Sequence, residues 1–410
     1  MNRLVLIGNG FDLAHGLKTS YKDFIVWYWE QWKLRLLSSD NKVESDGLCT
    51  FKLKDSVGLH GWYLVWGNHY KRTNIETPWK EMDIIDTVKN DKDTCEFEYI
   101  SPFFQRINQS IETKGWVDIE NEYYKLLEQN TLVRYSEEEI IKLNKQLAYL
   151  QGLLTEYLLT INQQDIPVNN NIKRKIYEPI KIKDVSVGAT FRLKKYIDSC
   201  NDKDLRVWET KLYNYGLDAL VYISDVEDYK SSPSTHNEPI AYMLPESIML
   251  LDFNYTKTAH QYLLKDKDIF SHIHIHGQLN KPEGVIFGYG DEFDDKYRRL
   301  QALDNNECLA NIKTIKYQES DNYRKVLQFI ESAPFQVYIM GHSCGNSDRT
   351  LLNTIFEHDN CISIKPFFYK KEDGSDSYIE TIQNISRNFN DMKLMRDRVV
   401  NKLYCEALTE

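Results

Sequence analysis

Short apolar runs, each bounded by Gly, Asn, Asp or Pro, occur at the start of the chain and again beyond about residue 245. Runs of this kind are typical of strands buried in a parallel sheet. Helical patterns at 348–357 and 378–388 alternate with them. The alternation predicts an α/β fold with a doubly wound, mostly parallel, Rossmann-type sheet. The predicted strands are residues 4–7, 248–253, 269–276, 285–288, 337–340 and 362–368.

The middle of the chain has a different pattern. A capping box begins at Ser136, and leucines at helical spacing follow it. Residues 115–128 give a second predicted helix with Trp116 and Ile119 on its apolar face. The middle therefore reads as a mainly helical insertion that interrupts the α/β domain. The expected boundaries are an α/β nucleotide-binding domain of residues 1–24 plus 245–410 and an insertion of residues 25–244.

Composition and charge argue against several classes of protein. The chain has 410 residues, 42% of them hydrophobic, and a net charge of −10. The negative charge argues against bulk attraction to nucleic acid or to an anionic membrane. We find no run of 18 apolar residues, no signal-peptide pattern and no C-x-x-C among the seven cysteines. We therefore expect a cytoplasmic protein with reduced thiols, no membrane partner and no cysteine zinc site.

The first predicted strand runs into a glycine turn, Gly8-Asn9-Gly10. A strand, a tight turn and a helix start can bring main-chain N–H groups close to a phosphate. The spacing is not the full G-x-G-x-x-G, because Asp12 and Leu13 stand where the third glycine is expected. The turn is thus either a nucleotide-binding turn or an ordinary strand-to-helix connection.

Asn254 follows the predicted strand 248–253. An asparagine at the carboxyl end of a strand can offer a ligand both an amide donor and a carbonyl acceptor. The alternative is that Asn254 caps the next helix, since Asn is a favoured N-cap residue.

Three histidines, His272, His274 and His276, alternate along the predicted strand 269–276, which would place all three on one face. Two interpretations compete: an H-x-H zinc site, or a single functional His276 that acts as an acid or base at the strand end. Neither cysteine spacing nor a carboxylate on the same strand completes a zinc site. We therefore expect no metal, with His272 and His274 partly buried and hydrogen-bonded.

Two further glycine-containing loops follow predicted strands, at 287–291 and 340–348. In the second, Gly341, Ser343 and Asp348 are candidate contacts for a phosphate or a ribose. The alternative is a plain helix start in which Asp348 complements the helix dipole. The string also matches G-x-S-x-G, but the order of residues along the chain does not suit a hydrolase triad.

The segment I-G-N-G-F-D-L-A-H-G-L-K-T-S-Y, residues 7–21, resembles the N-terminal signature of the AbiH family of bacterial abortive-infection proteins. W-V-D-I-E, L-D-F-N-Y-T, H-I-H-G and G-H-S-x-x-x-S-D, at 116–120, 251–256, 274–277 and 341–348, add to the likeness. More distantly, the order of glycine turn, strand-end Asn, strand-end His-Gly and late G-x-S turn resembles sirtuin-like NAD-binding domains. The cysteine zinc module of sirtuin deacylases is absent, which argues against protein deacylation.

These resemblances imply an antiphage effector that hydrolyses NAD, with Asn254 and His276 as the catalytic pair. They place Gly8, Asn9 and Gly10 near the pyrophosphate, and Asp12, Gly341, Ser343 and Asp348 near the rest of the dinucleotide. A phage-derived trigger, a partner protein and self-association are partners that the sequence leaves open. So are two other functions: a metal-dependent nuclease using the three histidines with Asp118 or Glu120, and a non-catalytic nucleotide sensor.

Overall fold

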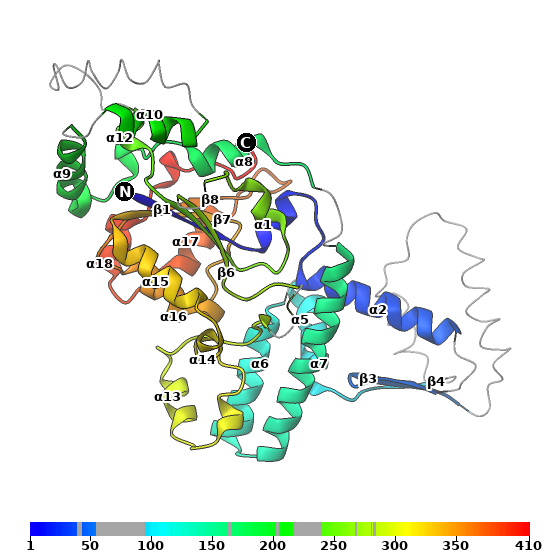
Figure 1. Ribbon diagram of the computed structural model, residues 1–410. Coiled ribbons are helices and arrows are strands. Elements are labelled where there is room, and N and C mark those ends of the chain that lie inside the picture. The colour runs from blue at the N-terminus through cyan, green and yellow to red at the C-terminus, as the bar shows by residue number, and fades with distance from the viewer. Residues whose placement is uncertain are drawn as a thin grey trace. The chain divides into compact units, whose positions relative to one another are not determined.

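The computed structural model (Figure 1) contains two compact units. The sheet unit comprises residues 1–18, 161–298 and 311–410, and the second unit comprises residues 19–160 and 299–310. The division into units reflects contacts within each unit and does not show where one domain is inserted into another. The expected domain boundaries therefore stay a prediction. The residues described are 1–38, 43–54, 95–115, 117–161, 166–201, 205–216, 240–266, 269–279, 281 and 284–410.

The sheet unit is built on five parallel strands in the order β6-β5-β1-β7-β8. β1 is therefore the central strand, with β5 and β6 on one side and β7 and β8 on the other. This arrangement confirms the predicted α/β fold with a parallel sheet. The strand predicted at 285–288 is wrong, because these residues belong to no strand, and the isolated bridge nearby joins Tyr289, just after them, to Ile312. The strands are β1 (Asn2–Ile7), β5 (Ile248–Asp252), β6 (Phe270–His274), β7 (Phe335–Met340) and β8 (Cys361–Phe367).

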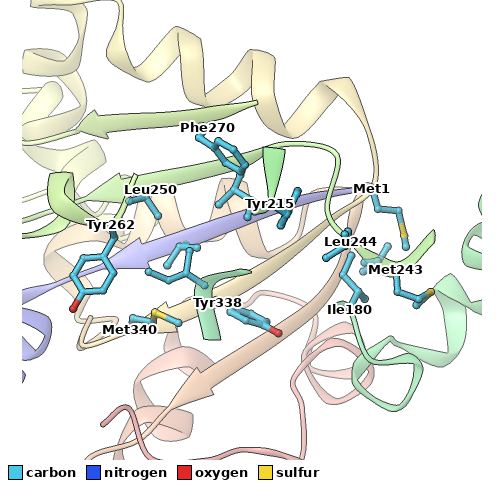
Figure 2. Close-up of a cluster of buried hydrophobic side chains, with 14 of the residues drawn as sticks. Met1, Ile180, Tyr215, Met243, Leu244, Leu250, Tyr262, Phe270, Tyr338 and Met340 are labelled. Atoms are coloured by element: carbon cyan, nitrogen blue, oxygen red, sulfur yellow. The ribbon is translucent and has the colours of Figure 1, made fainter. Parts of the chain in front are cut away.

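Alternate residues of the strands enter two separate apolar layers, one on each face of the sheet. In β1, Val5 and Ile7 belong to one layer, while Leu4 and Leu6 belong to the other. Figure 2 shows part of the first layer, in which Leu250 and Met340 lie with other buried side chains. Burial on both faces explains why these strands read as continuous apolar runs rather than as alternating ones.

Helices cover both faces of the sheet (Figure 1). The first layer is completed by α8 (Asn170–Tyr177), α9 (Thr190–Asn201), α10 (Leu205–Asn214) and α12 (Ile240–Met243). The second layer is completed by α15 (Asn322–Ser332), α16 (Arg349–Phe356), α17 (Tyr378–Arg387) and α18 (Met392–Arg398). The unit also contains α1 (Asn9–Ala14) and α14 (Lys313–Lys316), and α13 (Asp295–Gln301) begins within it.

The second unit combines helices with a small antiparallel sheet. Ser136 accepts a hydrogen bond from the Glu139 N–H at 3.4 Å, as the capping box predicts. The helix predicted at 115–128 begins later, because Gly115, with φ 74°, ends the preceding helix and Asp118 caps the next one. Trp116 lies outside the described residues. The elements are α2 (Tyr21–Ser38), β2 (Val43–Ser45), β3 (Cys49–Leu53), β4 (Cys95–Tyr99), α5 (Pro102–Lys114), α6 (Ile119–Glu128) and α7 (Glu137–Ile161).

The structure bears on the state of the cysteines and on the search for membrane-spanning helices. Cysteines are present as free thiols at all seven positions. Among the described residues, no helix is both long enough and apolar enough to cross a lipid bilayer.

The loops after β1 and β7 touch each other through their main chains, at the point where the strand order reverses. The Gly10 N–H donates to the Gly341 carbonyl at 2.8 Å. A Cβ on Gly341 would lie 2.1 Å from the Phe11 nitrogen, and one on Gly8 would lie 2.5 Å from the His342 Cα. Only glycine lets the two loops approach so closely, so packing explains these glycines without any ligand.

Gly341 and Gly16 provide a matched test of this close approach. Both have a left-handed backbone, with φ of 77° and 78°, but a Cβ at Gly16 would meet nothing within 4 Å. Gly16→Ala should therefore lower the free energy of unfolding by only about 1 kcal/mol, the cost of the backbone conformation. Gly341→Ala should cost about 1–3 kcal/mol more, because the neighbouring main chain must move. Urea unfolding of both variants measures the difference, and equal losses would contradict the packing argument.

Candidate functional site

Loops from the carboxyl ends of four neighbouring strands converge at one edge of the sheet. Asn254 follows β5 and donates from Nδ2 to the Gly8 carbonyl, which follows β1, at 3.0 Å. The Phe253 ring lies 5.2 Å from the His276 ring, which follows β6, and 4.0 Å from the His342 ring, which follows β7. The four loop segments expected from the sequence to form one site thus do come together, as parallel strands require.

Asn254 is buried and does not cap a helix. The next helical turn, Thr258–Tyr262, has Lys257 at its N-cap. The Asn254 N–H donates to Oδ1 of Asp252 at 2.9 Å, so its main chain is fixed as well as its side chain. Since Nδ2 is directed at the Gly8 carbonyl, Oδ1 is the side-chain atom left to accept a hydrogen bond.

His276 belongs to a buried charge cluster rather than to the row of histidines. β6 ends at His274, so the alternation predicted as far as residue 276 stops two residues early. Nε2 of His276 lies 3.1 Å from Oδ1 of Asp348, and the Lys313 Nζ donates to the same oxygen at 2.9 Å. His276, Lys313 and Asp348 are all buried. The side chain of Asp348 makes no capping hydrogen bond to α16, so pairing, not capping, accounts for it.

The cluster holds His276 neutral and Asp348 ionised. Burial lowers the pKa of His276, Lys313 acts in the same direction, and Asp348 opposes both. Burial raises the pKa of Asp348, but Lys313 and His276 outweigh it and hold the pKa well below its usual range. With Nε2–H donated to a carboxylate, the Nδ1 lone pair of the neutral ring is the basic position. An aspartate that fixes the tautomer of a neutral histidine is an arrangement suited to general-base catalysis.

Two more side chains complete this cluster, which we call the Asp348 cluster: His276, Lys313, Tyr317, His342 and Asp348. Tyr317 Oη lies 3.2 Å from the His276 Nε2, and its ring stacks on the His276 ring with an interplanar angle of 10°. Nε2 of His342 lies 3.7 Å from Oδ2 of Asp348. The carboxylate of Asp348 is therefore surrounded by donors from three parts of the chain.

The glycine-rich loop at 287–291 holds Lys313 in place. The Lys313 N–H donates to the Tyr289 carbonyl at 2.9 Å, and a Cβ on Gly288 would lie 2.1 Å from the Asn311 carbonyl oxygen. At the end of the loop, Asp291 pairs with Arg349 of α16 at 3.2 Å. This loop thus positions a buried cation of the cluster instead of forming the predicted strand.

The expected phosphate-binding residues differ in how they are engaged. Gly8 donates its N–H to the Met340 carbonyl at 3.3 Å, and Gly10 donates to Gly341, so both N–H groups have main-chain partners. Asn9 and Ser343 are exposed at this edge. A role for these residues in nucleotide binding stays a prediction.

A second buried polar cluster lies at the same ends of β5 and β6. Nε2 of His272 lies 3.0 Å from Oδ2 of Asp252, and Nδ1 of His274 lies 2.9 Å from the Asn254 carbonyl oxygen. Both histidines are thus hydrogen-bonded, as expected. Asp12, in α1, accepts a hydrogen bond from the Thr256 hydroxyl at 2.7 Å.

Burial dominates the ionisation of this second cluster. It raises the pKa of Asp12 to about 7 against the hydrogen bond from Thr256, and raises the pKa of Asp252 to about 7 against the charge of His274. It lowers the pKa of His272 to about 4, with His260 acting in the same direction. The charged forms of all three groups are therefore unfavourable as the cluster stands.

The sequence did not single out Lys313, Tyr317, His342 or Asp252 as site residues. Lys313 and Tyr317 lie in a polar helical segment with no motif, so no local signal marks them. His342 and Asp252 lie inside the quoted motifs and could have been found from their places at strand ends. By contrast, Asp118, a candidate ligand in the nuclease interpretation, is the N-cap of α6.

A family model described as bacteriophage abortive infection AbiH matches residues 4–370, a span that includes β5, β6, β7 and β8 in full and β1 from residue 4 onward. The chain belongs to the AbiH family of abortive-infection proteins. A search of the curated proteins gives no match. The match ends beyond α16, so the converging loops and the Asp348 cluster of this AbiH chain all lie inside the family region.

The pairing of Lys313 with Asp348 can be tested by stability. Lys313→Met leaves a buried carboxylate without its cation, and we expect it to lower the free energy of unfolding by about 3–5 kcal/mol at pH 7. Lys313→Met combined with Asp348→Asn should recover part of this loss, because no charge then stays buried. Equal losses in the single and double variants, measured by urea unfolding, would contradict the coupling.

The same pair predicts a pH dependence. The pKa of Asp348 is lower in the folded protein than its ordinary 3.8. The stability it provides is thus fully present above that ordinary value and is lost as the pH falls toward the depressed one. Unfolding followed from pH 6 down to about pH 2 should show this loss in the wild type and a smaller one in Asp348→Asn.

Proposed function

We propose that this AbiH-family protein is an abortive-infection effector that binds NAD and hydrolyses it to nicotinamide and ADP-ribose. Family membership supports the role in phage defence. The sirtuin-like order of motifs supports NAD as the substrate. One observation supports catalysis most directly: His276, at the end of β6, is buried, neutral and oriented by Asp348.

His276 is the proposed general base. Cleavage breaks the bond between the ribose C1′ and the pyridinium nitrogen. The electron pair of this bond stays on the nitrogen, so nicotinamide leaves as a neutral molecule. No proton has to be supplied to this leaving group, so the site needs a base and not an acid. Water adds to C1′, and its proton passes to Nδ1 of His276 and then to solvent. Asp348 is a positioning residue that acts through His276.

Asn254 is the proposed orienting residue. Its Nδ2 is bound to the Gly8 carbonyl, and its main chain is tied to Asp252, so its Oδ1 has a fixed place. A fixed acceptor can hold the attacking water or a ribose hydroxyl in line with C1′. In this proposal Gly8, Asn9 and Gly10 approach the pyrophosphate, and Gly341 and Ser343 lie along the rest of the dinucleotide. A phage-derived trigger would regulate when NAD is consumed.

Removal of either proposed catalytic side chain should abolish most of the activity. His276→Ala and Asn254→Ala should each reduce nicotinamide release by about 10²–10⁴-fold, as loss of a positioned base or of substrate orientation typically does. The measurement is chromatography of NAD incubated with purified protein, repeated with extracts of phage-infected cells. His358→Ala is the matched control, because His358 is another carboxylate-paired histidine, bonded to Glu331.

Full phage protection in both variants, or an unchanged cellular NAD level while protection occurs, would reject the mechanism. Far-ultraviolet circular dichroism of each variant separates a catalytic defect from a folding defect.

The role of Asp348 predicts a specific change in the pH profile. Asp348 raises the pKa of His276, so Asp348→Asn should move the acid limb of the kcat profile to lower pH. The same change should reduce kcat, because the His276 ring loses its fixed tautomer. A merely structural Asp348 would reduce the amount of active enzyme without moving the limb. Activity titrated between pH 4 and about pH 8 decides between the two.

A further inference from the structure

We propose that Asp252, His272 and His274 bind one divalent transition-metal ion of the zinc class at the ends of β5 and β6. This site is separate from the Asp348 cluster and does not depend on NAD hydrolysis. It departs from the expectation of no metal, which rested on the cysteine spacing and on the lack of a carboxylate on the same strand as the histidines. The neighbouring strand provides one, since Asp252 pairs with His274 across the β5–β6 register.

The donor atoms have the spacing of a metal site. Asp252, His272 and His274 each offer one ligand atom, and these atoms all lie within 4.8 Å of one another. Oδ2 of Asp252 lies 3.0 Å from Nε2 of His272 and 3.5 Å from Nδ1 of His274. Ligands about 2.0–2.1 Å from a tetrahedral zinc ion are separated by roughly 3.3 Å. Two histidines and one carboxylate form a donor set typical of zinc and of other first-row metals.

The charge balance of the buried carboxylates supports a cation here. Asp184 pairs with Lys365, Asp291 with Arg349 and Asp348 with Lys313. Within the described parts of the chain, Asp252 has no lysine or arginine partner, and its contacts are to histidines and a main-chain N–H. A buried carboxylate is normally paired with a cation or coordinates a metal, and the histidines here are disposed as ligands.

A nearby carboxylate gives an independent indication. Asp12 is buried, and its Oδ1 has no hydrogen-bond partner among the described residues, although its Oδ2 accepts from Thr256. Asp12 and Asp252 are close enough for their charges to repel each other. A cation bound at Asp252 would favour the ionised forms of both carboxylates. Metal binding at a neutral imidazole would leave the ring proton on the other ring nitrogen, and Asp252 would bind the ion as a carboxylate.

The ion would stabilise the loop that carries Asn254. Oδ1 of Asp252 accepts the Asn254 N–H, and the Asn254 carbonyl oxygen contacts Nδ1 of His274. Fixing Asp252 on the ion would hold the acceptor of the Asn254 N–H, while Nδ1 of His274 would exchange its contact with the Asn254 carbonyl oxygen for the ion. Protein loaded with the ion should resist thermal unfolding more than protein without it, since an ion that binds only the folded state stabilises that state.

Metal titration of the full chain, stripped with a chelator, tests the proposal. We expect about one Zn²⁺ or Co²⁺ per chain, with a visible absorption spectrum from Co²⁺ and two imidazole ligands by X-ray absorption of the zinc-loaded wild type. His272→Ala and His274→Ala should each weaken binding by at least about 10–100-fold, since even loss of an outer partner of a ligand has that effect. Asp252→Asn should weaken it in the same direction.

Two matched variants complete the design. His358→Ala, which alters a histidine paired with Glu331, and His276→Ala, which alters the Asp348 cluster, should leave metal affinity unchanged. If a ligand variant does not fold, the wild-type stoichiometry and imidazole count decide. Binding of less than one ion per chain, a spectrum without imidazole ligands, or affinity unchanged in His272→Ala and His274→Ala would each overturn the proposal. Loss of NAD hydrolysis with intact metal binding, as in His276→Ala, separates it from the proposed activity.

Discussion

The structure depends on the complete burial of β1 at the centre of the parallel sheet. Every residue of Asn2–Ile7 is buried, with β5 on one side, β7 on the other and an apolar layer against each face. Because the strand has no free edge or face, the loops that follow it and its neighbours have little freedom. Gly8, Gly10 and Gly341 let these loops meet main chain to main chain.

This constraint places two polar clusters at one edge of the sheet. In the Asp348 cluster, Lys313 compensates a buried carboxylate, and a neutral histidine stands beside it. In the other, Asp12 and Asp252 have histidines and threonines as partners. The two clusters differ in charge balance: the first contains its own cation, Lys313, whereas no lysine or arginine of the described residues pairs with Asp252. Asn254 contacts both the β1 loop and the second cluster, through Gly8 and His274.

Much of the fold could be predicted, because burial on both faces leaves a direct mark on the sequence. Five of the predicted strands are confirmed, with ends that differ by a few residues. The segment 285–288 resembles a strand because it is short, apolar and bounded by glycine, yet the Ile286 N–H donates to the His276 carbonyl and the Ile286 carbonyl accepts from the Tyr255 hydroxyl. Apolar character alone does not distinguish a strand from a buried loop. The sequence also placed His276 on the strand, because the alternation of histidine and isoleucine continues to residue 276, two residues beyond the end of β6.

By itself the sequence determined the class of fold and the strand-end loops that converge at one edge of the sheet, since strand periodicity and glycine turns are local signals. It also carried the family signature, with Asn254 and His276 in it. Only the tertiary structure decided what each polar side chain contacts. Lys313 reaches Asp348 from 35 residues away, and Asp252 faces His272 from the next strand. Charge compensation and metal-ligand geometry arise between segments distant in sequence, so no local pattern encodes them.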